Sequence, residues 1–550
     1  MQPSEWQIIM RQLLDAFASL HRLSGSEDAE RGAEVLCALL EQHGIPFTRE
    51  SCALWLSDPL SASLTLPDYP AMQFQAKTRS FSASCPEGCE AELFYDRQSM
   101  SFVTDKASAA WAASVRGKLV VADQGFEDYV QRLMQAGAAG LIHIWGSAET
   151  ALHEETVGPI WGTPVPDDAV RYPTIPVITI NQPQGQALLS HLQQQPVRAR
   201  ITTEVHEHVA RCSLPVVDIP GRSDEFVLLS SHYDSWHQGL TDNATGNALC
   251  LAMALAFSRS PQPLQRGLRI AWWPGHSNAR YGGSAWYADS HRAALLRHAV
   301  AHINVDSPGC VDGSELVINA SGAESPAWLN QALYAVTGKP AERITPLGKG
   351  ADQSFWGVSI PLHFALRETP LVRTTLSPGS GGGWWWHTEE DTQDKVDEAL
   401  LLRDAQIHYH WLQQLLREDV LPTDPQHYLQ QLSDALAQLQ SAVDPAFSLQ
   451  TWATWLDALL RECASSHHPS SQQAAITLWH RLRYRASDDY HPDLSYHGGA
   501  FPGMQLLSGH RRENCSDRYW LMLETQYMRQ LARGEELLKE SLTVLQAGRQ

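Results

Sequence analysis

Apolar side chains recur at helical spacing in the first segment of the chain, from Glu5 to Leu23. The run Ser24-Gly25-Ser26-Glu27 then has the composition of a capping box, which predicts a second helix that ends near Gly44 and Pro46. From Phe47 to about Leu66 the chain is predicted to be extended. We expect these opening elements to pack on a sheet formed further along the chain.

The pattern changes between about residues 70 and 200, where short apolar runs alternate with a helix and Pro-rich stretches form the boundaries. The predicted strands are Val115–Ala122, Gly140–Trp145 and Pro176–Ile180, and the predicted helix is Phe126–Ala136. This alternation predicts a small α/β unit that is inserted into the main fold and has a core of its own.

Alternation of strands and helices resumes at Glu225 and continues to about residue 417. The predicted strands are Phe226–Ser230, Leu268–Trp273, Ala299–Val305 and Glu315–Ala320, and the helices include Gly246–Ser258 and Asp394–Leu416. Short apolar strands separated by helices indicate an α/β fold with a mostly parallel sheet that is covered by helices on both faces.

The chain after Pro422 is predicted to be helical, apart from a loop-rich stretch between Asp488 and Arg511. The pattern therefore divides the 550 residues into four parts. Residues 1–66 begin the main α/β domain, residues 67–200 form the inserted unit, residues 201–420 complete the main domain, and residues 421–550 form a helical domain.

Composition and charge exclude some classes of partner. A net charge of −20 argues against nucleic acid or an anionic membrane surface, because both require clustered Lys and Arg. No apolar run reaches 18 residues, and the segment Met1 to Phe17 lacks the features of a signal peptide. The nine cysteines are scattered and odd in number, as in reduced proteins, so we expect a cytoplasmic location.

Four polar segments follow predicted strands or stand in loops, where ligand sites of open α/β sheets collect. They contain two imidazoles, His232 and His387, and two carboxylates, Asp242 and Asp306. These are ligand types that zinc and neighbouring divalent metals prefer. Asp234, two residues after His232, is placed to accept the second N–H of the His232 ring and fix its tautomer.

The order of these segments resembles that of the co-catalytic zinc aminopeptidases, a family that includes glutamate carboxypeptidase and the non-catalytic transferrin receptor. The shared pattern is His-x-Asp, Asp-Asn-Ala-x-Gly, a Gly-Gly-Ser turn, Asn-x-Asp and His-Thr-x-x-Asp-Thr. The resemblance implies a zinc-peptidase fold over residues 20–65 and 200–417, a protease-associated domain in the inserted unit, and one or two bound divalent ions. It implies that His232 and Asp306 hold one metal, that His387 belongs to the other, and that Asp242 bridges them.

One departure concerns two consecutive glutamates of the family, the first a general base and the second a metal ligand. His276 and Ser277 stand at those positions here. Three interpretations follow: His276 replaces the lost ligand, His276 is a neutral general base, or catalysis has been lost. Further along, Ala351-Asp352-Gln353 resembles a Ser-Asp-His stretch of the family, but only its Asp is kept and we assign it no role.

For substrate binding, Arg280 and the Trp384-Trp385-Trp386 run are the candidates. An arginine can bind a carboxylate through two of its guanidinium nitrogens, which makes Arg280 a candidate for a substrate carboxylate, although a structural ion pair fits the sequence equally well. Trp385 and Trp386 follow a Gly-Ser segment, as a loop that lines a pocket would. Glu389 and Glu390 beside His387 are reserve candidates for the base.

The sequence therefore predicts a metal-dependent amide hydrolase that acts on a small peptide or another small amide, with His276 and Asp234 as catalytic residues. A homodimer is compatible with this prediction. The alternative is a catalytically inactive, receptor-like binding protein built on the same fold.

Overall fold

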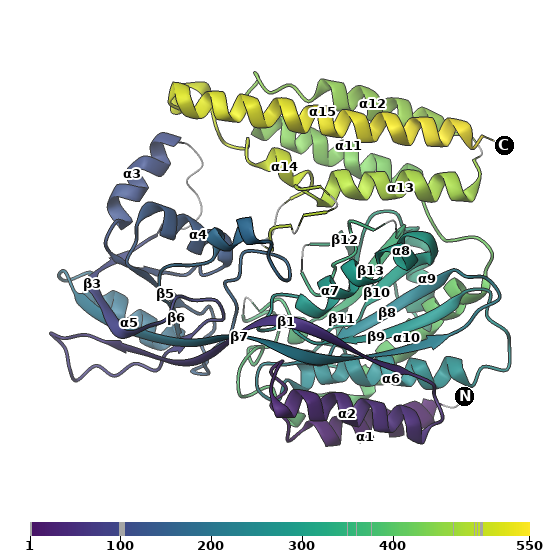
Figure 1. The fold of residues 1–550 in the computed structure, drawn as a ribbon, viewed down its shortest axis with the longest axis horizontal. Coiled ribbons are helices and arrows are strands. Elements are labelled where there is room, and N and C mark those ends of the chain that lie inside the picture. Colours follow the sequence, from purple (N-terminus) through teal and green to yellow (C-terminus); the bar gives the residue numbers. More distant parts are fainter. Residues whose placement is uncertain are drawn as a thin grey trace.

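The computed structural model describes residues 3–97, 105–348, 350–358, 360–375, 377–465, 467–488, 490–491, 493–495 and 499–549. The main α/β domain carries the inserted unit at one side and the C-terminal helical domain above it (Figure 1). None of the helices in these described ranges is long and apolar enough to cross a membrane.

Strands from the main domain and the inserted unit join in one 13-stranded sheet, in the order β12-β11-β13-β10-β8-β9-β7-β3-β4-β5-β6-β2, with β1 paired to β7. The strands are β1 (Thr48–Thr65), β2 (Lys77–Thr78), β3 (Cys85–Tyr95), β4 (Leu119–Ala122), β5 (Gly140–Ile144), β6 (Val177–Ile180), β7 (Arg198–Ile219), β8 (Phe226–His232), β9 (Gly267–Trp273), β10 (Ala299–Asn304), β11 (Glu315–Ala320), β12 (Arg343–Pro346) and β13 (Leu362–Thr369).

The centre of the main domain is parallel, because β8 pairs in parallel with both β9 and β10, and β10 with β13. Antiparallel pairs flank this centre, β7 with β9 and β11 with β13. The α/β class predicted from the sequence is thus confirmed, with its parallel strands at the centre of the sheet.

Helices cover both faces of this sheet (Figure 1). Val227, Leu229 and Ile270 face one core, which is filled by the N-terminal helices and by α6, α9 and α10. Their alternate neighbours Leu228 and Ala271 face a second core beneath α7 and α8. The helices of these layers are α1 (Pro3–Phe17), α2 (Glu27–Gln42), α6 (Thr245–Ser258), α7 (Gly282–Ser290), α8 (Arg292–His298), α9 (Pro326–Thr337) and α10 (Glu398–Arg417).

The N-terminal segment differs in detail from the prediction. Helix α1 ends at Phe17 instead of continuing to Leu23, because Arg22 turns into the interior, where its side chain is fully buried. Ser26, and not Ser24, is the N-cap of α2 and accepts the Ala29 N–H at 3.1 Å. Ser24 instead accepts the N–H of Gly275, in the loop after β9.

The inserted unit has two cores of its own, one on each face of its strands. Its helices are α3 (Asp105–Val115), α4 (Glu127–Ala136) and α5 (Gln182–Leu192). The strand predicted to start at Val115 begins only at Leu119, since Gly117 adopts a positive φ of 69° that ends the helix there.

The antiparallel ribbon of β1 and β7 joins the two bodies. Pairing runs from Thr48 opposite Val216 to Thr65 opposite Arg200, with one register shift between Pro59 and Ser61. One end of β7 pairs with β9 of the main domain, and the other end pairs with β3 of the inserted unit. The extended stretch predicted from Phe47 to about Leu66 corresponds to β1, whereas β7 was not predicted from the sequence.

The C-terminal helices α11 (Pro425–Ala442), α12 (Gln450–Glu462), α13 (Pro469–Tyr484), α14 (Pro502–Gln505) and α15 (Asp517–Ala547) share the first core with the main domain. His480 and Tyr484 of α13 contact the backbone carbonyls of Pro361 and Ser321, at 3.0 and 2.8 Å. The helical domain therefore packs on the loops at one end of the main sheet.

Candidate metal centre

Three of the predicted ligands converge at the carboxyl end of the parallel strands. His232 is the last residue of β8, Asp306 lies two residues beyond β10, and Asp242 lies in the turn Leu240–Ala244 that leads into α6. The His232 Nε2 lies 3.2 Å from Asp242 Oδ1 and 3.9 Å from Asp306 Oδ1. We call His232, Asp242 and Asp306 the primary group, because one atom of each lies within 4.8 Å of the others.

The primary group fits a divalent cation. The Nε2 of His232 and the Oδ1 of Asp242 are buried and have no hydrogen-bond partner in the protein. A buried polar atom without a partner is costly, whereas a metal ligand needs its lone pair free. One imidazole and two carboxylates are also a donor set that zinc and other first-row divalent metals accept.

Electrostatics at this point favour added positive charge. Burial opposes ionisation of Asp306, but the charge of Arg367, whose Nη1 lies 3.3 Å from Asp306 Oδ2, and that of His232 outweigh it and lower the pKa of that carboxyl to about 2. Burial likewise opposes a charge on His232, yet Asp242 and Asp306 raise the pKa of its imidazole well above the ordinary value. The two carboxylates thus attract a cation, either a proton on imidazole or a metal ion.

Arg22 holds the loop between His232 and Asp242. Its guanidinium donates to the backbone carbonyls of Tyr233, Gln238 and Gly239 at 2.9, 2.7 and 3.1 Å. Burial lowers the pKa of Arg22 to about 10, which still leaves it charged at neutral pH. The N-terminal segment therefore fixes the backbone from which two ligands of the primary group project.

Asp391, in the His-Thr-x-x-Asp-Thr motif, anchors the same loop from the other side. Its carboxylate accepts the backbone N–H groups of Thr241 and Asp242 at 2.9 and 3.0 Å and the Thr241 hydroxyl at 2.8 Å. Burial raises the pKa of Asp391 to about 7 in spite of these bonds. The motif thus contributes a loop anchor in addition to His387.

Asp234 lies beneath the primary group and is fully buried. Its backbone carbonyl, rather than its carboxylate, makes the short contact with His232 Nδ1, at 2.9 Å, and the carboxylate Oδ1 lies 3.7 Å from that nitrogen. The carboxylate instead accepts the backbone N–H groups of His276 and Ser277. Asp234 therefore orients both the His232 ring and the loop after β9.

His276 lies against the primary group. Its ring stacks on that of His232, with centroids 3.7 Å apart and planes 11° from parallel. Its Nδ1 lies 2.7 Å from Asp352 Oδ2, and Asp352 is itself held by the Ser284 hydroxyl at 2.7 Å. Among the described residues, His276 belongs to neither of the two metal-compatible groups, and its free ring nitrogen is Nε2.

His387 lies on the other side of Asp242, with its Nε2 3.1 Å from Asp242 Oδ2. Its φ of 58° is unusual for a residue other than glycine. Two bonds to the inserted unit hold it there: the His387 carbonyl accepts the Glu154 N–H at 2.8 Å, and His387 Nδ1 lies 3.0 Å from the Glu154 carbonyl oxygen.

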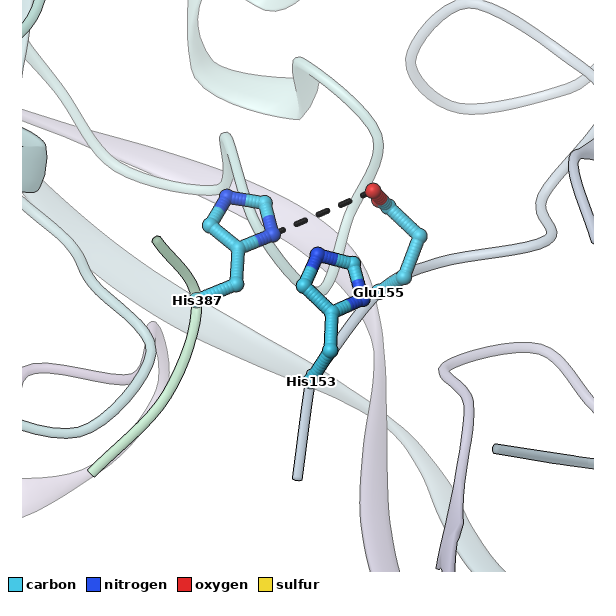
Figure 2. Close-up of side chains that lie close together, drawn as sticks. All are labelled: His153, Glu155 and His387. Carbon is cyan, nitrogen blue, oxygen red and sulfur yellow. Dashed lines mark ion pairs between the residues drawn. The ribbon is translucent and has the colours of Figure 1, made fainter. Parts of the chain in front are cut away.

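A second metal-compatible group joins His387 to the inserted unit. It consists of His153, Glu155 and His387, all buried, and we call it the insert group. Figure 2 shows the two rings side by side, with the Glu155 carboxylate directed at His387. Glu155 Oε2 lies 3.8 Å from His387 Nδ1. His153 and Glu155 were not predicted from the sequence; the available signal was a His-Glu-Glu run in the insert, combined with a ligand missing at position 277.

The substrate candidates are all close to these groups but already engaged. Arg280 is buried and forms an ion pair with Glu127 of α4. Trp385 donates its indole N–H to the Thr241 hydroxyl at 3.1 Å, and Trp386 stacks on the His387 ring at 3.8 Å. Glu389 is exposed and lies 3.6 Å from Lys77, outside both groups.

A cavity of about 290 Å³ adjoins the loop that carries Asp352. Its walls come from the inserted unit, the main domain and the helical domain, and they include Trp161, Trp286, Arg292, Trp356, Arg485 and Tyr490. Trp161 donates to the Ser354 hydroxyl at 2.7 Å, two residues from Asp352. Hydrogen bonds from Trp161 to Ser354, between Ser354 and Ser284, and from Ser284 to Asp352 therefore link the wall of the cavity to the His276–Asp352 pair.

Comparison with known proteins agrees with this geometry. The family model described as "Peptidase family M28" matches residues 216–412. This segment contains His232, Asp242, Asp306 and His387. Residues 216–412 are thus similar to peptidase family M28, and we call them the M28 domain for this similarity. The family resemblance deduced from the motifs is thereby confirmed.

Individual relatives of the M28 domain are distant. An aminopeptidase from Pseudomonas aeruginosa (strain UCBPP-PA14) is 26% identical over 246 residues, which are 43% of this chain and 40% of the relative. Carboxypeptidase Q of Mus musculus is 24% identical and covers 61% of this chain and 72% of its own. The structure of a zinc aminopeptidase from Bacillus subtilis superposes with a TM-score of 0.57 over 77% of this chain and 97% of its own, at 16% identity. The last comparison shows a common fold.

Proposed function

We propose that the protein is a metal-dependent hydrolase of peptides or other small amides. The convergence of the primary group, with two buried ligand atoms that lack protein partners, carries this proposal. The relatives named as aminopeptidase and carboxypeptidase support it. The structural neighbour named as a zinc aminopeptidase supports zinc or another divalent metal as the cofactor. His232, Asp242 and Asp306 would hold the ion.

When bound there, such an ion supplies Lewis acidity, which polarises a substrate carbonyl and lowers the pKa of water. The protein must then provide a group that moves a proton. We assign this role to His276, because Asp352 holds its Nδ1–H at 2.7 Å and leaves Nε2 to accept a proton from the attacking water. The same nitrogen then delivers the proton to the leaving amine. The stacking of His276 on His232 places this base beside the residues that would hold the ion.

Asp234 supports this arrangement as a positioning residue, since it binds both the His232 ring and the backbone of His276. We propose that the cavity of about 290 Å³ beside the Asp352 loop receives part of the substrate. Trp385 and Trp386 would shape the wall near His387. Arg280 would act by holding Glu127 of the inserted unit against the M28 domain, rather than as a free carboxylate ligand.

The inserted unit is proposed to be of the protease-associated type. A cytoplasmic location is proposed as well, and the nine free thiols are consistent with it. Homodimerisation stays a prediction from the sequence.

Metal content and hydrolysis test the proposal together. Protein purified without added metal is analysed for divalent ions and assayed on dipeptides, aminoacyl anilides and N-acyl amino acids, with and without chelator. We expect hydrolysis that chelator abolishes and zinc restores, and loss of both metal and turnover in Asp306→Asn. Protein that binds no divalent ion and hydrolyses none of these amides would instead support the receptor-like alternative.

Substitution of His276 separates its possible roles. His276→Gln is expected to keep its metal while turnover falls by roughly 10²–10⁴-fold, the usual contribution of a general base. Glu389→Gln is the matched control, because that carboxylate is exposed and lies outside both groups. Release of metal from His276→Gln would make His276 a ligand, and unchanged turnover would remove it from the mechanism.

A further inference from the structure

The inserted unit brings two unused ligand-type side chains against the M28 domain. His153 is fully buried, and neither of its ring nitrogens has a hydrogen-bond partner. Its ring is clamped by stacking on Trp145, with centroids 3.7 Å apart and planes 3° from parallel. The centroid of the His153 ring also lies 5.3 Å from that of His387 and 4.8 Å from that of Trp386. A rigidly held imidazole with two bare nitrogens is unusual in a protein interior.

One carboxylate oxygen of Glu155 is directed at the His387 ring, beside His153. Its Oε1 accepts the N–H of Thr156 at 2.9 Å, which fixes the carboxylate, while Oε2 faces His387 Nδ1 at 3.8 Å. Figure 2 shows this orientation, with His153 below the gap between the two groups. Both side chains belong to a loop that is bound to the His387 backbone through Glu154.

We propose that His153, Glu155 and His387 form a binding site for a second divalent cation, to which the inserted unit supplies two of the three protein ligands. Two imidazoles and one carboxylate are a donor set typical of zinc sites that keep an open position. The site deepens the proposed function, because it places a second ion next to the primary group. It also accounts for position 277, where Ser277 offers no carboxylate to a second ion.

Asp242 links the two sites through the His387 ring. His387 Nδ1 lies 3.0 Å from the Glu154 carbonyl oxygen, so a cation held through Nδ1 would take the place of that contact and of the Nδ1 proton. Nε2 would then carry the ring proton and donate it to Asp242 Oδ2, 3.1 Å away. The other oxygen of Asp242, Oδ1, faces the primary group. One carboxylate thereby contacts the first ion and orients the ligand of the second.

Metal stoichiometry tests the site without reference to hydrolysis. Protein stripped with chelator is titrated with Zn²⁺, and separately with Co²⁺ as a spectroscopic probe, and bound metal is counted after dialysis. Wild type is expected to bind two equivalents. His153→Phe, which keeps an aromatic ring against Trp145, and Glu155→Gln, which keeps the Thr156 hydrogen bond, are each expected to retain one. Asp306→Asn is expected to lose the other equivalent.

His143→Gln is the matched control, because His143 is a buried histidine of the inserted unit that contacts Arg79 and lies outside the insert group. It should retain both equivalents. The ligand variants should lower the affinity of the second equivalent by more than the roughly 10–100-fold that loss of an outer partner causes. Circular dichroism establishes whether each variant is folded. If His153→Phe does not fold, Glu155→Gln, which changes the side-chain volume least, still tests the site.

Two results would overturn the inference. One is a wild-type protein that binds a single equivalent, removed by Asp306→Asn but not by His153→Phe or Glu155→Gln. The other is retention of both equivalents by those two variants. Either result leaves the proposed hydrolase intact, whereas two equivalents without hydrolysis of any amide would leave the site intact and refute the hydrolase.

Discussion

Replacement of Arg22 by methionine tests whether the N-terminal segment holds the metal centre together. Arg22 is fully buried and, beside a long contact of 3.5 Å to the Phe17 carbonyl, donates three short hydrogen bonds to the carbonyls of Tyr233, Gln238 and Gly239. Hydrogen bonds from a charged donor contribute about 1.5–3 kcal/mol each, so their gross loss is about 5–9 kcal/mol. Burial of the guanidinium offsets part of this, and the fall of its pKa to about 10 corresponds to about 3 kcal/mol at about 1.4 kcal/mol per unit.

The net destabilisation expected for Arg22→Met is therefore about 2–6 kcal/mol, measured by urea unfolding at neutral pH. Because the freed carbonyls lie between His232 and Asp242, Zn²⁺ affinity should also fall by about 10–100-fold, as when a partner of a metal ligand is removed. Arg31→Met is the control. Arg31 is exposed and forms a surface ion pair with Asp28 at 3.3 Å, which contributes about 0.5 kcal/mol or less.

A change in unfolding free energy below about 1 kcal/mol, together with unchanged Zn²⁺ affinity, would refute the reasoning, since at least one carbonyl must then be satisfied without Arg22. A loss of stability without a loss of affinity would show that the ligand loop is held by Asp391 alone.

Three further predictions concern other parts of the molecule. Asp352→Asn removes the charged partner of His276 Nδ1, and turnover should fall by roughly 10–150-fold at constant metal content, the equivalent of about 1.5–3 kcal/mol. Burial raises the pKa of Glu324 to about 7, so the folded state binds more protons than the unfolded state above the ordinary glutamate pKa, and stability falls as pH rises toward 7. The stability of Glu324→Gln relative to wild type should therefore improve by about 2 kcal/mol between pH 5.5 and 8 in urea unfolding, and a pH-independent difference would contradict this. Ser26→Ala removes the N-cap of α2 and should cost about 1 kcal/mol in the same assay, whereas a neutral result would mean that Ala29 finds another acceptor.

The parallel core of the fold could be predicted from the sequence because its strands are buried on both faces. Phe226 to Leu229 is a continuous apolar run that ends at polar residues, and Leu268 to Trp273 is an apolar run interrupted only by Arg269. Both form central strands of the sheet. Strand β7 was missed because most of its length is exposed on at least one face and carries charges such as Glu204 and Glu207. Its pairing with β1, rather than a hydrophobic pattern, maintains it.

The primary group could be predicted because its residues are tied to strand ends, which topology brings together. His153, Glu155 and Asp352 could not be found in this way. They stand in irregular loops, and Asp352 reaches His276 across 76 positions of sequence. Their proximity depends on tertiary contacts, such as the Glu154–His387 pairing, for which neither periodicity nor spacing gives a signal.

The long ribbon of β1 and β7 has a mechanical consequence. Two bodies joined by a flexible linker can move apart freely, but β7 is hydrogen-bonded to strands of both bodies and transmits bending directly from one to the other. Opening would have to rupture ladder pairs or bend the ribbon at its one register shift, beside Pro59. The ribbon therefore fixes the distance between the loop of His153 and the end of β8. Entry to and exit from the metal centre must then depend on movements of side chains and loops.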